Sequence, residues 1–177
     1  EEALLKRSLD IREKSLGTDH PDVAKSLTSL GKLQIEINYL DKDSEYQKAE
    51  ELLKRALNIR ETALGPDHPD VAESLTWLAF VNLSQVKSTY EKAKEYLKPG
   101  SKEEALLNRA LEIREKALGP DHPDVADSLY NLGDLSSTII YLNNGEGDYA
   151  KAEDLFRRAL DIYEKALGPD HTNVGKN

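Results

Sequence analysis

The sequence predicts an all-α solenoid of seven helices, and two observations carry that prediction. The first is an internal repeat, because residues 52–75 and 106–129 match at 20 of 24 positions and residues 4–27 match the former at 18. The histidines that mark each copy, at positions 20, 68, 122 and 171, lie 48, 54 and 49 residues apart. The second is a helical spacing of apolar residues in every copy. Helical repeats of this length are typical of a solenoid, in which each unit packs only on its neighbours.

Each copy contains one helical pattern around Arg-Ala-Leu or a close variant, and we name these segments B helices. In the second copy the apolar stripe follows the i, i+3, i+4, i+7 rule. It comprises Ala49, Leu52, Leu53, Ala56, Leu57, Ala63 and Leu64. Gly65 and Pro66 then end the helix, because glycine suits a helix C-terminus and proline cannot continue a helix. The predicted B helices cover about 1–16, 47–64, 102–118 and 149–167.

A second helical pattern follows each Asp-His-Pro-Asp segment, and we name these segments A helices. Pro69 fits the first turn, where a missing N–H costs nothing, and Asp70 lies favourably at the positive end of the helix dipole. The apolar stripe comprises Val71, Ala72, Leu75, Leu78, Ala79 and Leu83. The predicted A helices cover about 21–38, 69–88 and 123–142. Residues 1–177 are therefore expected to form a single array, in which a leading B helix precedes A/B repeats at about 21–64, 69–118 and 123–167.

The segment RALxIREKALGPDHPDVAxSLxxL resembles the long tetratricopeptide repeat (TPR) of the kinesin light chain type, and the resemblance covers essentially the whole chain. It implies antiparallel helix pairs that wind into a right-handed superhelix, with the A helices lining the concave face and the B helices the convex face. It also implies a family that binds peptides and has no catalytic activity of its own.

The junctions from A to B helices are longer than in that family by roughly six to twelve residues. The additional segments are NYLDKDSEY, VKSTYEKAKEYLKPGS and IYLNNGEGDY. In the second junction, residues 90–97 either extend the A helix or form a short helix of their own. In the third, Asn143, Asn144, Gly145 and Gly147 predict a loop.

Composition excludes several classes of function. Lys and Arg number 24 against 33 Asp and Glu, a net charge of −9, which argues against a nucleic-acid partner. The sequence contains no run of 18 apolar residues, so no membrane partner is expected. Cysteine is absent, which removes disulfides, thiolate metal sites and cysteine nucleophiles. Methionine is absent even at position 1, which suggests an excised fragment, and with no visible signal peptide we expect a cytoplasmic protein without a cofactor.

Three recurring groups could carry chemistry. Asp19, His20 and Asp22, with their equivalents at 67–70 and 121–124, have side chains of metal-ligating type, but a connector in which Asp and His satisfy free helix-end N–H groups is favoured over a metal site.

The Arg residues of the B helices could form a basic ladder, but adjacent glutamates favour ion pairs on a solvated convex face. These are Arg7, Arg12, Arg55, Arg60, Arg109, Arg114, Arg157 and Arg158, with Glu13, Glu61, Glu115 and Glu164. The recurring Ser26, Ser74 and Ser128 lack the partners of a nucleophile, so no enzyme is expected.

The functional prediction is a protein-interaction module that binds a peptide or partner segment in the concave groove of the A helices. A structural spacer or self-assembling scaffold is the alternative.

The helix positions facing away from the core stripe are Lys25, Thr28, Ser29 and Lys32 in the first copy, Glu73, Thr76, Trp77 and Phe80 in the second, and Asp127, Tyr130, Asn131 and Asp134 in the third. The predicted binding residues are all of these except the two threonines. The resemblance implies an asparagine at the positions of Ser29, Trp77 and Asn131, and only Asn131 matches. The aromatic residues Trp77, Phe80 and Tyr130 instead indicate an apolar anchor pocket.

The apolar stripes of the two terminal B helices are expected to be buried against another surface, because repeat arrays normally need capping units. The first helix carries Leu4, Leu5, Leu9 and Ile11, and the last carries Leu155, Phe156, Leu160 and Ile162. Neighbouring molecules could supply that cover, which predicts end-to-end self-association.

Overall fold

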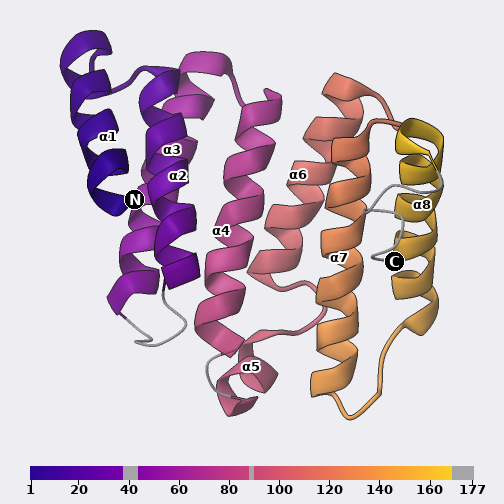
Figure 1. The fold of residues 1–177 in the computed structure, drawn as a ribbon. Coiled ribbons are helices and arrows are strands. Elements are labelled where there is room, and N and C mark those ends of the chain that lie inside the picture. Colours follow the sequence, from indigo (N-terminus) through magenta and orange to yellow (C-terminus); the bar gives the residue numbers. More distant parts are fainter. Residues whose placement is uncertain (38–43, 88–89, 169–177) are drawn as a thin grey trace. The chain divides into compact units, whose positions relative to one another are not determined.

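The computed structural model of the protein describes residues 1–37, 44–87 and 90–168 and is all-helical over those ranges. The described chain forms eight helices: α1 (Glu2–Leu16), α2 (Pro21–Ile37), α3 (Ser44–Leu64), α4 (Pro69–Lys87), α5 (Tyr90–Tyr96), α6 (Lys102–Leu118), α7 (Pro123–Leu142) and α8 (Tyr149–Leu167) (Figure 1). The seven expected helices are all present, and each begins and ends within three residues of its expected bounds. The A helices are α2, α4 and α7, and the B helices are α1, α3, α6 and α8.

The eighth helix, α5, corrects the expected count of seven. It lies in the second junction, and of the two alternatives for residues 90–97 the structure has the separate short helix. Ala93 and Leu97 are buried, and α5 packs on α7. The third junction is the expected loop, in which Asn144 and Gly145 have φ angles of 58° and 85°. Residues 38–43 of the first junction lie outside the described part of the chain.

The chain divides into two compact units, Glu1–Ser88 and Thr89–Asn177. In unit 1, α2 packs on α1, α3 and α4, and successive helices run in opposite directions (Figure 1). In unit 2, α7 packs on α5, α6 and α8. In each unit, therefore, an A helix packs against the B helices that flank it in the chain.

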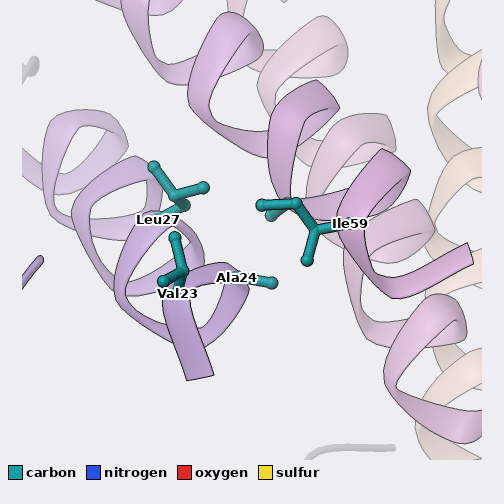
Figure 2. Close-up of a cluster of buried hydrophobic side chains, with 5 residues drawn as sticks. Val23, Ala24, Leu27 and Ile59 are labelled. Carbon is teal, nitrogen blue, oxygen red and sulfur yellow. The ribbon is translucent and has the colours of Figure 1, made fainter. Parts of the chain in front are cut away.

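The core of unit 1 lies where the apolar stripes of A and B helices meet. Figure 2 shows Val23, Ala24 and Leu27 of α2 facing Ile59 of α3, and Ala56 completes this cluster. The stripe predicted for the second A helix is confirmed, because all six of its residues are buried in α4. Burial of such stripes, at about 25 cal/mol per Å² of apolar surface, is the main force that holds neighbouring helices together.

The connectors between B and A helices have the same geometry in each copy. Each A helix begins at the proline of Asp-His-Pro-Asp, and the Nδ1 atom of the preceding histidine accepts a hydrogen bond of 3.1 Å from a backbone N–H two residues on. The pairs are His20 with Asp22, His68 with Asp70, and His122 with Asp124. The glycine that ends each B helix has a φ of 87–89°, a value that only glycine adopts without strain. The histidines therefore act as helix N-caps, as the connector interpretation requires.

Candidate binding surface on the A helices

The structure brings four of the ten predicted binding residues together, all in unit 1. Lys32 comes from α2, and Glu73, Trp77 and Phe80 come from α4. Lys32 Nζ lies 2.7 Å from Glu73 Oε1 and 4.5 Å from the centroid of the Trp77 ring. The rings of Trp77 and Phe80 are tilted by 41° with centroids 5.5 Å apart, and both side chains are half-buried. We name these four residues the Trp77 surface.

The ion pair and the ring contact join the two A helices of unit 1. A cation within about 6 Å of an aromatic ring is attracted to the face of the ring, so Lys32 is held by both Glu73 and Trp77. Trp77 is therefore half-buried, with the Lys32 side chain of the neighbouring A helix packed over its ring.

Glu73 has a second cationic partner beneath the surface. Its Oε2 atom accepts a hydrogen bond of 2.8 Å from Arg60 of α3. Burial raises the pKa of Glu73, but Lys32 and Arg60 outweigh it and hold the pKa below its usual value. The carboxylate is thus charged at neutral pH and fixed from both sides.

The other two predicted residues of unit 1 make only local contacts. Lys25 is exposed and pairs with Asp22 at 3.2 Å, and the exposed Ser29 donates to the Lys25 carbonyl. Thr28 and Thr76, which the sequence placed on the open face, are buried instead. Each donates its hydroxyl hydrogen to the carbonyl four residues earlier at 2.9 Å, which removes the cost of burying it.

The four predicted residues of unit 2 lie on α7 in a different arrangement. Tyr130 packs edge to face against Phe156 of α8, with ring centroids 5.5 Å apart. The Asp127 carboxylate accepts a hydrogen bond from the Tyr163 hydroxyl, and the pKa of Tyr163 is raised by burial and by this carboxylate. Asn131 is half-buried and Asp134 is exposed. Tyr130 and Asp127 are therefore engaged with α8.

The expectation of a solvated arginine face is wrong for two of its members. Arg60 is 1% exposed and Arg114 is also buried, whereas Glu13 and Glu115 do form the expected ion pairs between B helices, with Arg55 and Arg158. The buried arginines lie at a position where the side chain reaches across the connector to the next A helix.

The same contact recurs in all three complete copies, buried at Arg60 and Arg114 and half-buried at Arg12, and we name it the arginine clamp. In each, one guanidinium nitrogen donates to a serine hydroxyl at 2.6–2.7 Å and to the carbonyl of the connector's second aspartate at 2.9–3.3 Å. The sets are Arg12 with Ser26 and Asp22, Arg60 with Ser74 and Asp70, and Arg114 with Ser128 and Asp124. The constant spacing of 14 residues between arginine and serine is the sequence signal that could have predicted it. In the fourth copy Tyr163 occupies the arginine position.

The described residues contain no group of three or more His, Asp or Glu side chains placed to hold a metal ion. Among the helices described, none combines the length and apolar character needed to cross a membrane. The described surface carries aromatic, charged and hydrogen-bonding groups on repeated helices.

The family follows from comparison with known proteins. A family model described as tetratricopeptide repeat matches residues 1–22, 23–70, 102–124 and 144–173, which is well over half of the chain. The chain belongs to the tetratricopeptide repeat family. Members of this family are non-catalytic scaffolds that mediate interactions between proteins.

Similar solved structures support the same fold. The nearly identical TPR-like repeats of a candidate kinesin light chain from Podospora anserina are 24% identical with a TM-score of 0.60, and the match covers 98% of this chain and 70% of that one. A variant of the same protein matches at 22% identity and a TM-score of 0.63. BtubC (BKLC) from P. vanneervenii is 19% identical with a TM-score of 0.66, over 96% of this chain and 57% of its own. No curated protein matches the chain.

Proposed function

We propose that the chain is a protein-interaction module that holds a peptide segment of a partner protein against the Trp77 surface. The observation that carries the proposal is the pair of half-buried rings, Trp77 and Phe80, beside an ion pair that spans two A helices. Aromatic anchors surrounded by polar groups dominate the energetics of protein interfaces. The peptide is extended or helical, with one hydrophobic anchor and residues of both charges that meet Lys32 and Glu73.

The remaining predicted residues stay predicted contacts, each considered within its own unit. Lys25 and Ser29 present exposed polar groups on α2. Asp127, Tyr130, Asn131 and Asp134 are proposed contacts on unit 2, where Asp134 and the open part of Asn131 offer hydrogen bonds. The cytoplasm stays the expected compartment.

A structural spacer is the alternative, and one observation favours it. Lys32, Glu73 and Trp77 already satisfy one another, as they would if their role were only to join α2 to α4. The two proposals differ in the effect that Trp77→Ala has on peptide binding by a chain that still folds.

The test begins with selection of a displayed library of random peptides on the purified chain. The best peptide is labelled, and its affinity is measured by fluorescence anisotropy for the parent chain, for Trp77→Ala and for Ser29→Ala. Ser29 occupies the slot in α2 that Trp77 occupies in α4, so it is the matched control. We expect Trp77→Ala to weaken binding by about tenfold or more, and Ser29→Ala, which removes only a peripheral contact, to weaken it by less than about twofold.

Circular dichroism and thermal melting establish that both variants fold. A folded Trp77→Ala chain with unchanged affinity would show that the binding surface is misplaced. If the library yields no binding peptide, the spacer alternative is supported.

A further inference from the structure

A second surface, unrelated to the Trp77 surface, lies where α7 ends and α8 begins. A hollow of about 490 Å³ is lined there by Ser137, Ile140, Tyr141, Asn144, Gly145 and Tyr149. The lining contains no charged side chain. Two of its residues are large exposed aromatics, since Tyr141 is 74% exposed and Tyr149 is 61% exposed. We name this the tyrosine hollow.

The loop that builds the tyrosine hollow is firmly held. Gly145 N–H donates to the Ile140 carbonyl at 2.9 Å, and Glu146 N–H donates to the Asn143 carbonyl at 3.1 Å. Asp148 accepts a hydrogen bond of 2.9 Å from Lys151 N–H, which caps α8. A Cβ atom on Gly145 would lie 3.3 Å from the Tyr149 hydroxyl, so glycine leaves room for that side chain. The backbone of the loop is therefore held in place before a ligand binds, which reduces the entropy lost on binding.

A neighbouring hollow that the same loop lines is acidic. A smaller hollow of about 220 Å³ shares Ile140 with the first and is lined by Glu104, Glu146, Asp148 and Lys151 among others. Lys151 is neutralised by Glu104 at 2.6 Å. Burial raises the pKa of Glu104, but the hydrogen bonds from Lys151 and from Gly100 N–H outweigh it, so Glu104 is charged at neutral pH. Glu146 and Asp148 remain as excess negative charge on the loop.

We infer that the tyrosine hollow binds an extended proline-rich segment of another protein that carries a basic residue next to its prolines. Proline-rich segments adopt the polyproline II conformation and dock into grooves lined by exposed aromatic side chains, where hydroxyl and amide groups meet their free carbonyls. Tyr141 and Tyr149 supply the rings, Ser137 and Asn144 supply the hydrogen-bonding groups, and Glu146 and Asp148 supply the complement to the basic residue. This surface arises from the third junction and does not depend on the Trp77 surface.

The test uses a set of fluorescein-labelled proline-rich peptides, each ending in arginine, and the full 177-residue chain. Anisotropy is measured for the parent chain, for Tyr149→Ala and Tyr141→Ala, and for Tyr149→Phe. We expect saturable binding that each alanine variant weakens by about tenfold and that Tyr149→Phe largely keeps, because the ring makes the contact.

Three controls separate this surface from others. Tyr96→Ala removes a tyrosine of α5 that is 63% exposed but does not line the hollow, and it leaves binding unchanged. Trp77→Ala also leaves it unchanged, so failure here is distinct from failure of the proposed function. Replacing the peptide's arginine with glutamate, or Glu146 with Gln, weakens binding several-fold at low salt.

Two results overturn the inference. One is the absence of saturable binding for every peptide of the set. The other is binding that persists in a folded Tyr141→Ala, Tyr149→Ala double variant, as judged by its circular dichroism spectrum and melting temperature.

Discussion

The helices α1 and α3 have nearly the same repeat pattern but very different surroundings. Both contain the sequence Leu-Leu-Lys-Arg, followed by Ile-Arg-Glu, at equivalent positions. Ile59 of α3 is 3% exposed, whereas Ile11 of α1 is 54% exposed. The side of α3 that carries Ile59 packs against α2 (Figure 2), whereas the equivalent side of α1 leaves Leu4 and Ile11 largely exposed. The repeat pattern thus determines the helix and its stripe, and the neighbouring helix determines how much that stripe stabilises the fold.

The last B helix shows that position at an end is not sufficient to expose the stripe. In α8, Leu155 and Ile162 are buried and Phe156 packs on Tyr130 of α7. The expectation of an uncovered stripe is therefore wrong for these residues of α8, because α7 precedes it and supplies the cover. It holds for Leu4 and Ile11 of α1, which are 71% and 54% exposed, whereas Leu5 and Leu9 are half-buried and Leu9 packs against the cluster of Val23 and Ile59.

The largest expected effect comes from truncating the matched isoleucines. Ile59→Ala should lower the free energy of unfolding by about 3 kcal/mol, because it removes buried methyl groups and leaves a cavity. Ile11→Ala should lower it by less than about 1 kcal/mol, because the side chain is already largely in water. Urea unfolding followed by circular dichroism measures both. Equal losses for the two variants would mean that α1 is covered in solution.

The arginine clamp provides the next comparison. Arg60→Ala should cost about 2 kcal/mol, because it leaves the Ser74 hydroxyl and one Glu73 oxygen without their buried partner. Arg12→Ala should cost about half as much, since Arg12 is only half-buried. The same urea titrations report both values. A larger loss for Arg12→Ala would contradict the role assigned to burial.

Removing the connector histidine should lower the free energy of unfolding equally in the first and second copies. His68→Ala removes the side-chain acceptor for Asp70 N–H and should cost about 1 kcal/mol, and His20→Ala should cost the same, because the bonds have equal length. Peptide binding should not change in either variant. Tight, stoichiometric uptake of zinc that His68→Ala abolishes, measured by calorimetry, would instead support a metal site.

The smallest expected effect is on self-association. If the uncovered face of α1 finds cover on a second molecule, the mass measured by light scattering should rise with protein concentration. Ile11→Lys should suppress that rise without lowering the melting temperature, because the new charge stays in water. A charge placed at another exposed position, Ser29→Lys, serves as the control. A constant monomeric mass at high concentration would count against the end-to-end contact.

The helices were predictable from the sequence because local signals mark both ends of most of them. The glycine after each B helix and the proline that begins each A helix place the boundaries to within three residues. The sequence leaves α5 as one of two alternatives, because residues 90–97 begin like the B helices at Tyr46 and Tyr149 but are soon followed by Pro99-Gly100.

The candidate site was harder to predict because its contacts join different helices. The repeat placed Lys32, Glu73 and Trp77 on the A helices, but their mutual contact requires the packing of α2 on α4. Arg60 was misassigned to the surface because charged side chains are rarely buried unless paired, and its partner Ser74 lies on the next helix. The threonines were misassigned because their hydroxyls bond within their own helix.

The arginine clamp has a consequence for how the length of such an array can change. Each clamp lies wholly within one B helix, its connector and the start of the next A helix, so the residues that form it are contiguous in the chain. A deletion of residues 65–118 would join the end of α3 to the connector at Gly119 and leave Arg60 14 residues before Ser128, the spacing that every clamp has. We expect such a chain to fold cooperatively, as measured by a single urea transition. Duplication or loss of gene segments with both ends in these connectors would then lengthen or shorten the protein without breaking a buried hydrogen bond.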